Sequence, residues 1–194
     1  MNCLNSTKYI DTLLTFIIII FLFTGKAMAY EEPKYVLIKK TDVYEVRSYE
    51  DRLAVKTFQG QGQDRAFGRL FKYISGSNQS SSKIAMTIPV LQSKESNGSA
   101  MYFFLPKSYS QKNAPLPKSD NIKLVTVKRG YFAVIKYTGR TTDQNFKRNI
   151  NLLKETLKND NISFNAEPIQ AIYNGPFTPF FLRRNEAMYH INWK

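Results

Sequence analysis

Residues able to perform acid-base, nucleophilic or metal chemistry are scarce in this chain. Cysteine and histidine occur once each, at Cys3 and His190. A disulfide needs paired cysteines, a structural zinc site needs about four Cys or His ligands, and a Ser-His-Asp or Cys-His centre needs a well-placed imidazole. The composition therefore predicts a binding protein with no catalytic residues and no metal site, rather than an enzyme.

Two groups of polar residues nevertheless bear on catalysis. Arg183, Arg184 and Glu186 place cations beside a carboxylate, and residues 80–82 are a run of serines. No general base accompanies the serines and no partner acid can be assigned to Glu186, so nucleophilic and paired-carboxylate mechanisms have no support. We expect the serines to form a flexible connector. The arginine–glutamate cluster is expected to tie the ends of the fold together.

The first thirty residues predict an export signal. Lys8 precedes an apolar run at 13–23, and residues 27–29 supply the small-x-small pattern of a signal peptidase site. The run is shorter than the roughly 20 residues that cross a bilayer, which favours cleavage after Ala29 over an uncleaved anchor. Residues 30–194 would then form one domain, periplasmic or secreted, without a cysteine that could mispair.

The charge of the chain limits the classes of molecule that it is expected to bind. The 194 residues include 28 lysines and arginines against 15 aspartates and glutamates, a net charge of +13. The basic residues are scattered in ones and twos and no nucleic-acid-binding motif is present, which disfavours a nucleic acid. An anionic membrane surface or an anionic amphiphile fits this charge better.

Two similar segments predict an internal repeat. LAVKTFQG at 53–60 aligns with FAVIKYTG at 132–139, and the same offset continues without a gap into the segments that follow. Each half is read as strand, glycine turn, helix and two further strands. A further strand candidate, at 43–49 or 123–129, precedes each copy and is expected to join it in a hairpin.

The second expected helix has a narrow apolar face. It begins with a capping box in which Thr141 and Gln144 satisfy each other's backbone donors. Its apolar positions form one stripe suited to a single sheet: Phe146, Ile150, Leu153 and Leu157.

The first expected helix, which ends at Gly76, has a wider apolar face of about 160°. It is formed by Ala66, Phe67, Leu70, Phe71, Tyr73 and Ile74. Either a neighbouring loop covers the extra edge, or a ligand does. In the second interpretation Leu70 and Tyr73 border a groove. The core is then faced by Phe67, Phe71 and Ile74.

Four strings resemble the SOUL haem-binding protein family: YEVRSYE at 44–50, AFGRLFKYISGSN at 66–78, KIAMTIPV at 83–90 and YNGPFTPFFLRRNEAM at 173–188. The resemblance covers nearly all of residues 35–191. It implies an α+β fold, a distorted antiparallel β-barrel with two flanking helices, built from two pseudo-symmetric strand-helix-strand-strand repeats. It also implies binding of haem or another porphyrin in a shallow hydrophobic groove beside the first helix. We expect the protein to be a monomer and to catalyse no reaction.

The resemblance links the propionates of the ligand to basic residues of the first helix. Lys72 matches such a position, and the expected binding residues are Arg65, Arg69, Leu70, Lys72 and Tyr73. Asp64 and Thr178 depart from the family pattern, in which relatives can carry Arg and Lys. These departures leave open a protein- or membrane-interaction module on the same barrel without tetrapyrrole binding. An enzyme acting on tetrapyrroles is a third possibility.

Axial ligation of iron is not expected. The first helix contains no histidine, and in the alternating segment 187–193 His190 falls on the more polar face, which favours a solvent-exposed side chain. Met86, Met101 and Met188 are chemically able to ligate iron, but methionine more often fills a core.

The export signal leads to a direct test. We expect the mature protein to begin near Tyr30 and to occur outside the cytoplasm, because residues 27–29 match a cleavage site. Mass spectrometry of the native N-terminus measures this. An intact Met1 in membrane fractions would identify the segment as an anchor instead.

Overall fold

The computed structural model describes residues 30–60, 65–96 and 98–194. The expected signal segment 1–29 and Asp64 lie outside these residues. Two compact units, Met1–Tyr30 and Glu31–Lys194, divide the chain. The second unit holds every described strand and helix and three clusters of buried apolar side chains, so it has a core of its own. Among the described helices, none is long and apolar enough to cross a membrane.

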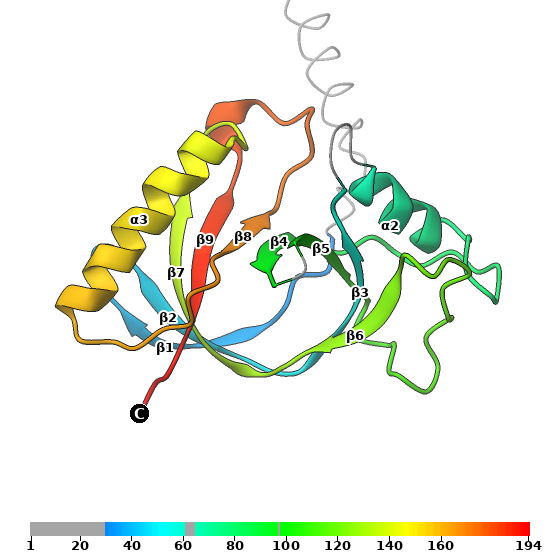
Figure 1. Ribbon diagram of the computed structural model, residues 1–194, viewed down its shortest axis with the longest axis horizontal. Helices are drawn as coiled ribbons and strands as arrows, with labels where there is room; N and C mark the ends of the chain where they lie inside the picture. Colours follow the sequence, from blue (N-terminus) through cyan, green and yellow to red (C-terminus); the bar gives the residue numbers. More distant parts are fainter. Residues whose placement is uncertain (1–29, 61–64, 97) are drawn as a thin grey trace, which may run out of the picture. The chain divides into compact units, whose positions relative to one another are not determined.

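Strands dominate the described residues, with two α-helices and one short 3-10 helix (Figure 1). In chain order the elements are β1 (Tyr35–Lys40), β2 (Glu45–Tyr49), β3 (Arg52–Phe58), α2 (Ala66–Ile74), β4 (Val90–Glu95), β5 (Gly98–Phe104), β6 (Lys123–Val127), β7 (Gly130–Tyr137), α3 (Asp143–Asn159), β8 (Ile169–Ile172), η1 (Phe180–Leu182) and β9 (Asn185–Ile191).

The nine described strands form one antiparallel sheet in the order β1-β2-β7-β9-β8-β4-β5-β3-β6. The sheet curls, and α2 and α3 lie on its outer side (Figure 1). The α+β class, the antiparallel sheet and the two flanking helices are as expected. Within the described residues the edge strands β1 and β6 do not pair with each other, so the distorted barrel that the resemblance implies is a half-barrel. The internal repeat stays a prediction.

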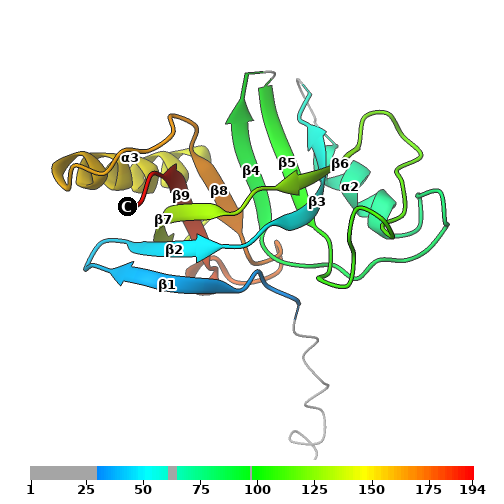
Figure 2. The same cartoon turned by 90° about the horizontal axis from the view of Figure 1, so that it is seen from below.

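The two expected hairpins are wrong. β2 pairs with β7 and β3 pairs with β6, in one register that runs from Glu45 opposite Val134 to Arg52 opposite Val127 (Figure 2). The residues predicted to turn instead contact each other. Asp51 accepts a hydrogen bond from the backbone N–H of Arg129 at 2.6 Å and lies 3.5 Å from the Lys128 ammonium. Both segments therefore stay extended and pair with each other.

Helix α3 confirms the predicted stripe. Ile150, Leu153 and Leu157 are buried against β7 and β9, and Phe146 packs at the edge of the same cluster. The predicted capping box is wrong by one residue, because the cap is Thr142, whose side chain accepts from the Asn145 N–H at 3.3 Å. The hydroxyl group of Thr141 donates to Asn185 instead.

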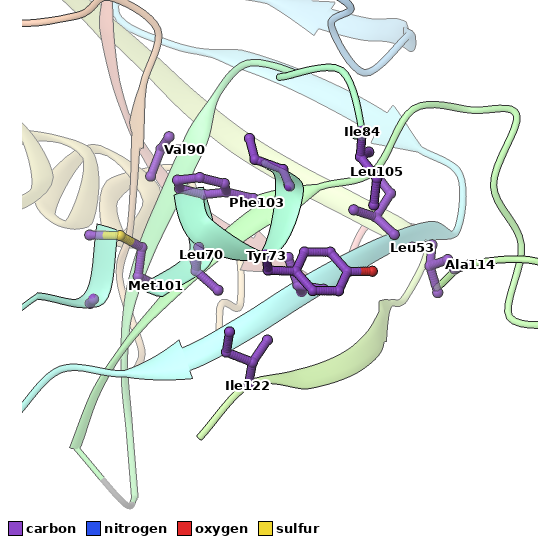
Figure 3. Packing of buried hydrophobic residues seen from close by; sticks show 13 residues of the cluster. Leu53, Leu70, Tyr73, Ile84, Val90, Met101, Phe103, Leu105, Ala114 and Ile122 are labelled. Carbon is purple, nitrogen blue, oxygen red and sulfur yellow. The ribbon is translucent and has the colours of Figure 1, made fainter. Parts of the chain in front are cut away.

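Helix α2 faces the sheet with the side that was predicted to border a ligand groove, so this prediction is wrong. Leu70 and Tyr73 are 0% exposed and point into the buried apolar cluster that α2 forms with β3 and β5 (Figure 3). The Tyr73 hydroxyl donates to the Pro115 carbonyl at 2.6 Å. Phe67 and Phe71, expected in the core, are each 49% exposed.

The physical reason lies in the segment between β5 and β6. Leu105, Ala114 and Ile122 from this segment cover Leu70 and Tyr73, so the loop interpretation is correct for that edge of the helix. Because this segment covers Leu70 and Tyr73, the other side of the helix, which carries Phe67 and Phe71, lies at the surface. Ile74 is buried, as predicted.

This orientation predicts opposite outcomes for neighbouring residues. Leu70→Asp should unfold the domain, because a carboxylate would be buried without a partner. Phe71→Asp should lower the free energy of unfolding by less than about 1 kcal/mol, as surface substitutions usually do. Urea denaturation followed by circular dichroism measures both. Equal destabilisation by the two variants would contradict the orientation of α2.

Candidate functional site

The outer side of α2 carries an exposed aromatic pair. The rings of Phe67 and Phe71 lie one helical turn apart, with centroids separated by 6.1 Å and planes inclined by only 12°. Phe67 also packs edge-to-face with the buried ring of Phe103, with the ring centroids 5.1 Å apart. The pair therefore forms a supported, nearly flat apolar surface that is half open to solvent.

A glycine separates this pair from the cations of the helix. At 100° per residue, Gly68 lies about 60° from Phe71 and about 40° from Lys72 around the helix. A Cβ atom at Gly68 would meet only the Arg65 Cβ, at 4.0 Å, so the space above it is open. Arg65 and Lys72 are exposed. We name these five residues, Arg65, Phe67, Gly68, Phe71 and Lys72, the α2 surface.

Arg69 lies close to the sheet rather than on the α2 surface. Its Nε donates to the Thr57 hydroxyl at 3.1 Å and its Nη2 to the Phe58 carbonyl at 2.6 Å. These bonds fasten the helix to β3. Of the five residues predicted to bind a ligand, Arg65 and Lys72 thus share an open surface, Arg69 contacts β3, and Leu70 and Tyr73 lie in the core.

A small apolar cavity opens on the inner face of the sheet, opposite the helices. Its volume is about 60 Å³, and its wall includes Phe104, Phe132 and Met188. Two of the cations near it are paired: Arg52 lies 3.4 Å from Glu31, and Lys56, in an adjoining hollow of about 290 Å³, lies 2.5 Å from Glu95. The cavity and the hollow share Leu91, Val127 and Ile169 in their walls. The apolar part alone is smaller than the pockets of about 300–1,000 Å³ that hold drug-sized ligands.

A buried ion pair lies beside this cavity, because Tyr49 and Tyr173 of the cavity wall hydrogen-bond to it. The guanidinium of Arg47 donates to both carboxylate oxygens of Glu186, at 3.0 and 3.2 Å, and both side chains are fully buried. Tyr173 donates to the same carboxylate at 2.8 Å, and Arg184 donates to it at 2.9 Å. Both oxygens are occupied, which confirms the structural interpretation of the arginine–glutamate cluster.

The ion pair shifts the pKa values of Arg47 and of the neighbouring Tyr173. Burial alone would lower the pKa of Arg47, but the Glu186 carboxylate and the Tyr49 hydroxyl together outweigh burial and raise the pKa. Burial raises the pKa of Tyr173, and the carboxylate adds to that shift. Sequence reasoning missed Arg47. Its signal was an alternating strand with charge at every second position, Glu45 and then Arg47, which is unusual for an inward-facing side.

His190 is not the solvated residue that alternation predicts. It is half-buried, its ring meets Phe132 edge-on at 5.1 Å, and its Nδ1 is buried without a hydrogen-bond partner among the described residues. Gly130 makes room for it, because a Cβ there would lie 2.4 Å from Nε2. Both faces of β9 are covered, and Met188 is buried as core filler.

A family model described as SOUL heme-binding protein matches residues 30–190. No match is found among curated proteins. Solved structures with a similar fold include the C-terminal domain of EcmrR (7% identity, TM-score 0.58, covering 78% of this chain and 98% of that one). A hydrolase from Listeria innocua is also similar (7% identity, TM-score 0.54, covering 80% and 94%). An uncharacterised conserved protein from the same organism is a third (10%, 0.51, 85% and 94%). At such low identities these likenesses show the fold alone.

The buried ion pair predicts that substitutions of its two members have non-additive effects on the free energy of unfolding. Arg47→Met should lower the free energy of unfolding by about 3–5 kcal/mol, because Glu186 loses its buried partner. Arg47→Met combined with Glu186→Met removes both charges and should cost no more than the single change. Urea denaturation of the single and double variants measures this. Additive losses would show that the two side chains stabilise the fold independently.

Proposed function

Because the chain belongs to the SOUL haem-binding protein family, we propose that it binds haem or another tetrapyrrole on the α2 surface and catalyses no reaction on it. The observation that carries the proposal is the juxtaposition on one helix of an exposed aromatic pair, an open glycine and two cations. A flat, apolar dianion matches each of these three parts.

The aromatic pair suits the plane of the macrocycle. Aromatic rings favour offset stacking, and Phe67 and Phe71 present near-parallel rings supported by Phe103. Covering the exposed part of both rings stabilises the complex by about 25 cal/mol per Å² of apolar surface removed from water. Gly68 lets the ligand approach the helix backbone closely.

The cations suit the propionates. Lys72 and Arg65 follow Gly68 around the helix, so a ligand that covers the phenylalanines directs its carboxylates toward their side chains, and hydrogen bonds between charged groups are strong. Arg69, Leu70 and Tyr73 have a supporting role in this proposal, because they hold α2 against β3 and the core.

The α2 surface offers iron no axial ligand. The helix, AFGRLFKYI, contains no histidine, cysteine or methionine. His190 packs against Phe132, on the face of the sheet opposite α2. Affinity should therefore come from apolar and propionate contacts, and the metal should contribute little.

Support for a non-catalytic role comes from the residues that resemble catalytic groups. Both oxygens of Glu186 are engaged by Arg47, Tyr173 and Arg184, which leaves no site for a substrate proton. The hydrolase name of one structural neighbour carries no activity to this chain at 7% identity. With the predicted export signal, we place this binding protein in the periplasm or outside the cell.

Gly68→Leu is the sharpest test of the site. Leucine has a higher helix propensity than glycine by roughly 0.8–1 kcal/mol, so the variant should be at least as stable as the native chain. Its side chain would fill the space between Phe71 and Lys72, and the affinity for hemin should fall at least about tenfold, or about 1.4 kcal/mol. Titration of residues 30–194 with hemin, followed by absorbance, measures the affinity.

Three controls accompany this titration. Asn151→Leu, at an exposed position of α3, should leave the affinity unchanged. Metal-free protoporphyrin should bind within about tenfold of hemin, and His190→Ala should change neither the affinity nor the hemin spectrum. Native affinity in Gly68→Leu would refute the site, and a low-spin spectrum lost in His190→Ala would establish axial ligation.

A further inference from the structure

The connection between β8 and β9 exposes a group of large apolar side chains. This connection lies near the top of Figure 1. We name its residues 176–182 the aromatic loop. Phe177 is 99% exposed, Phe181 62% and Leu182 65%. Single exposed apolar residues are common, but a contiguous group of this size marks an interaction site.

The exposure follows from hydrogen bonds that hold the backbone. Arg183 donates from Nε to the Thr178 carbonyl at 2.8 Å and from Nη2 to the Pro176 carbonyl at 2.6 Å. These two carbonyls flank Phe177. The Phe180 carbonyl accepts from the Gly139 N–H at 3.0 Å, which fastens the loop to the end of β7. The loop is thus a built structure that presents its aromatic side chains outward.

Cations lie directly beside these aromatic side chains. The Arg140 guanidinium lies 5.4 Å from the centre of the Phe180 ring. A surface hollow of about 430 Å³ lies between the aromatic loop and the start of the connection to α3, with both Arg140 and Arg183 in its wall and no acidic residue. Thr141 and Thr178 add hydroxyl groups to the same wall. Such a hollow fits a phosphate group.

We propose that the aromatic loop docks on an anionic lipid bilayer, with Phe177, Phe181 and Leu182 entering the interface and a lipid phosphate between Arg140 and Arg183. Phenylalanine and leucine side chains enter the boundary between headgroups and acyl chains, and neighbouring cations add electrostatic attraction to anionic lipids. The net charge of +13 adds a long-range attraction to such a surface. This inference does not depend on tetrapyrrole binding.

A bilayer fits the shape of the loop better than a protein partner does. Phe177 projects from the surface with almost no contact to the rest of the chain, whereas a protein partner would have to supply a pocket complementary to each projecting ring. Lipid accepts projecting apolar groups without a preformed pocket.

The test uses residues 30–194, because the apolar run at 13–23 would itself bind lipid. The protein is sedimented with phosphatidylcholine vesicles, with and without phosphatidylglycerol. We expect it to bind the anionic vesicles in preference to the neutral ones. Phe177→Ser combined with Phe181→Ser should lower the partition coefficient at least about tenfold, because two exposed aromatic anchors are lost. Thermal denaturation should show an unchanged fold.

Two further variants separate the loop from general charge attraction. Leu116→Ser removes a similarly exposed apolar side chain elsewhere, 52% exposed, and should bind vesicles like the native protein. Arg140→Gln should weaken binding to the anionic vesicles only. Binding by the double serine variant at the native level would show that charge alone drives association and would overturn the proposal, as would failure of the native protein to bind either vesicle.

Discussion

A buried arginine–glutamate pair constrains the whole half-barrel. Arg47 on β2 and Glu186 on β9 lie on either side of β7, and neither charge is exposed. Since an isolated buried charge costs several kcal/mol, the three strands are stable only in the register that brings these side chains together. Tyr173 and Arg184 bind the same carboxylate, so the chain entering and leaving the aromatic loop is held at the same point.

The same constraint organises both proposed binding surfaces. With β2 paired to β7, its continuation β3 pairs with β6 on the other side of the sheet, and α2 then packs on β3 and β5 with its phenylalanines outward. Arg183, next to the pinned Arg184, shapes the aromatic loop. The α2 surface and the aromatic loop are therefore two separate sites that the same strand pairing positions. Each of them combines exposed apolar side chains with neighbouring cations.

This distribution of polar groups is consistent with binding rather than catalysis. Three acids on the inner face, Glu45, Glu95 and Glu186, are each paired with a cation, which stabilises the structure and leaves these carboxylates little freedom to move protons. The cations on the α2 surface are exposed. A fold shared with a protein named a hydrolase does not determine the chemistry, because function follows from the groups at a site.

The sequence by itself determined the family, through motifs whose residues stand together in the chain, and the resemblance implied the α+β class. It also determined the buried stripe of α3 and the structural role of Glu186, because these follow from local periodicity and residue type. Only the tertiary structure decided how the strands pair and which side of α2 is buried. Alternation is the same in a hairpin and in a long-range pair. Likewise, an apolar arc of about 160° does not specify which part faces the sheet. The segment carrying Ala114, distant in sequence, covers Leu70 and Tyr73 and so leaves Phe67 and Phe71 at the surface.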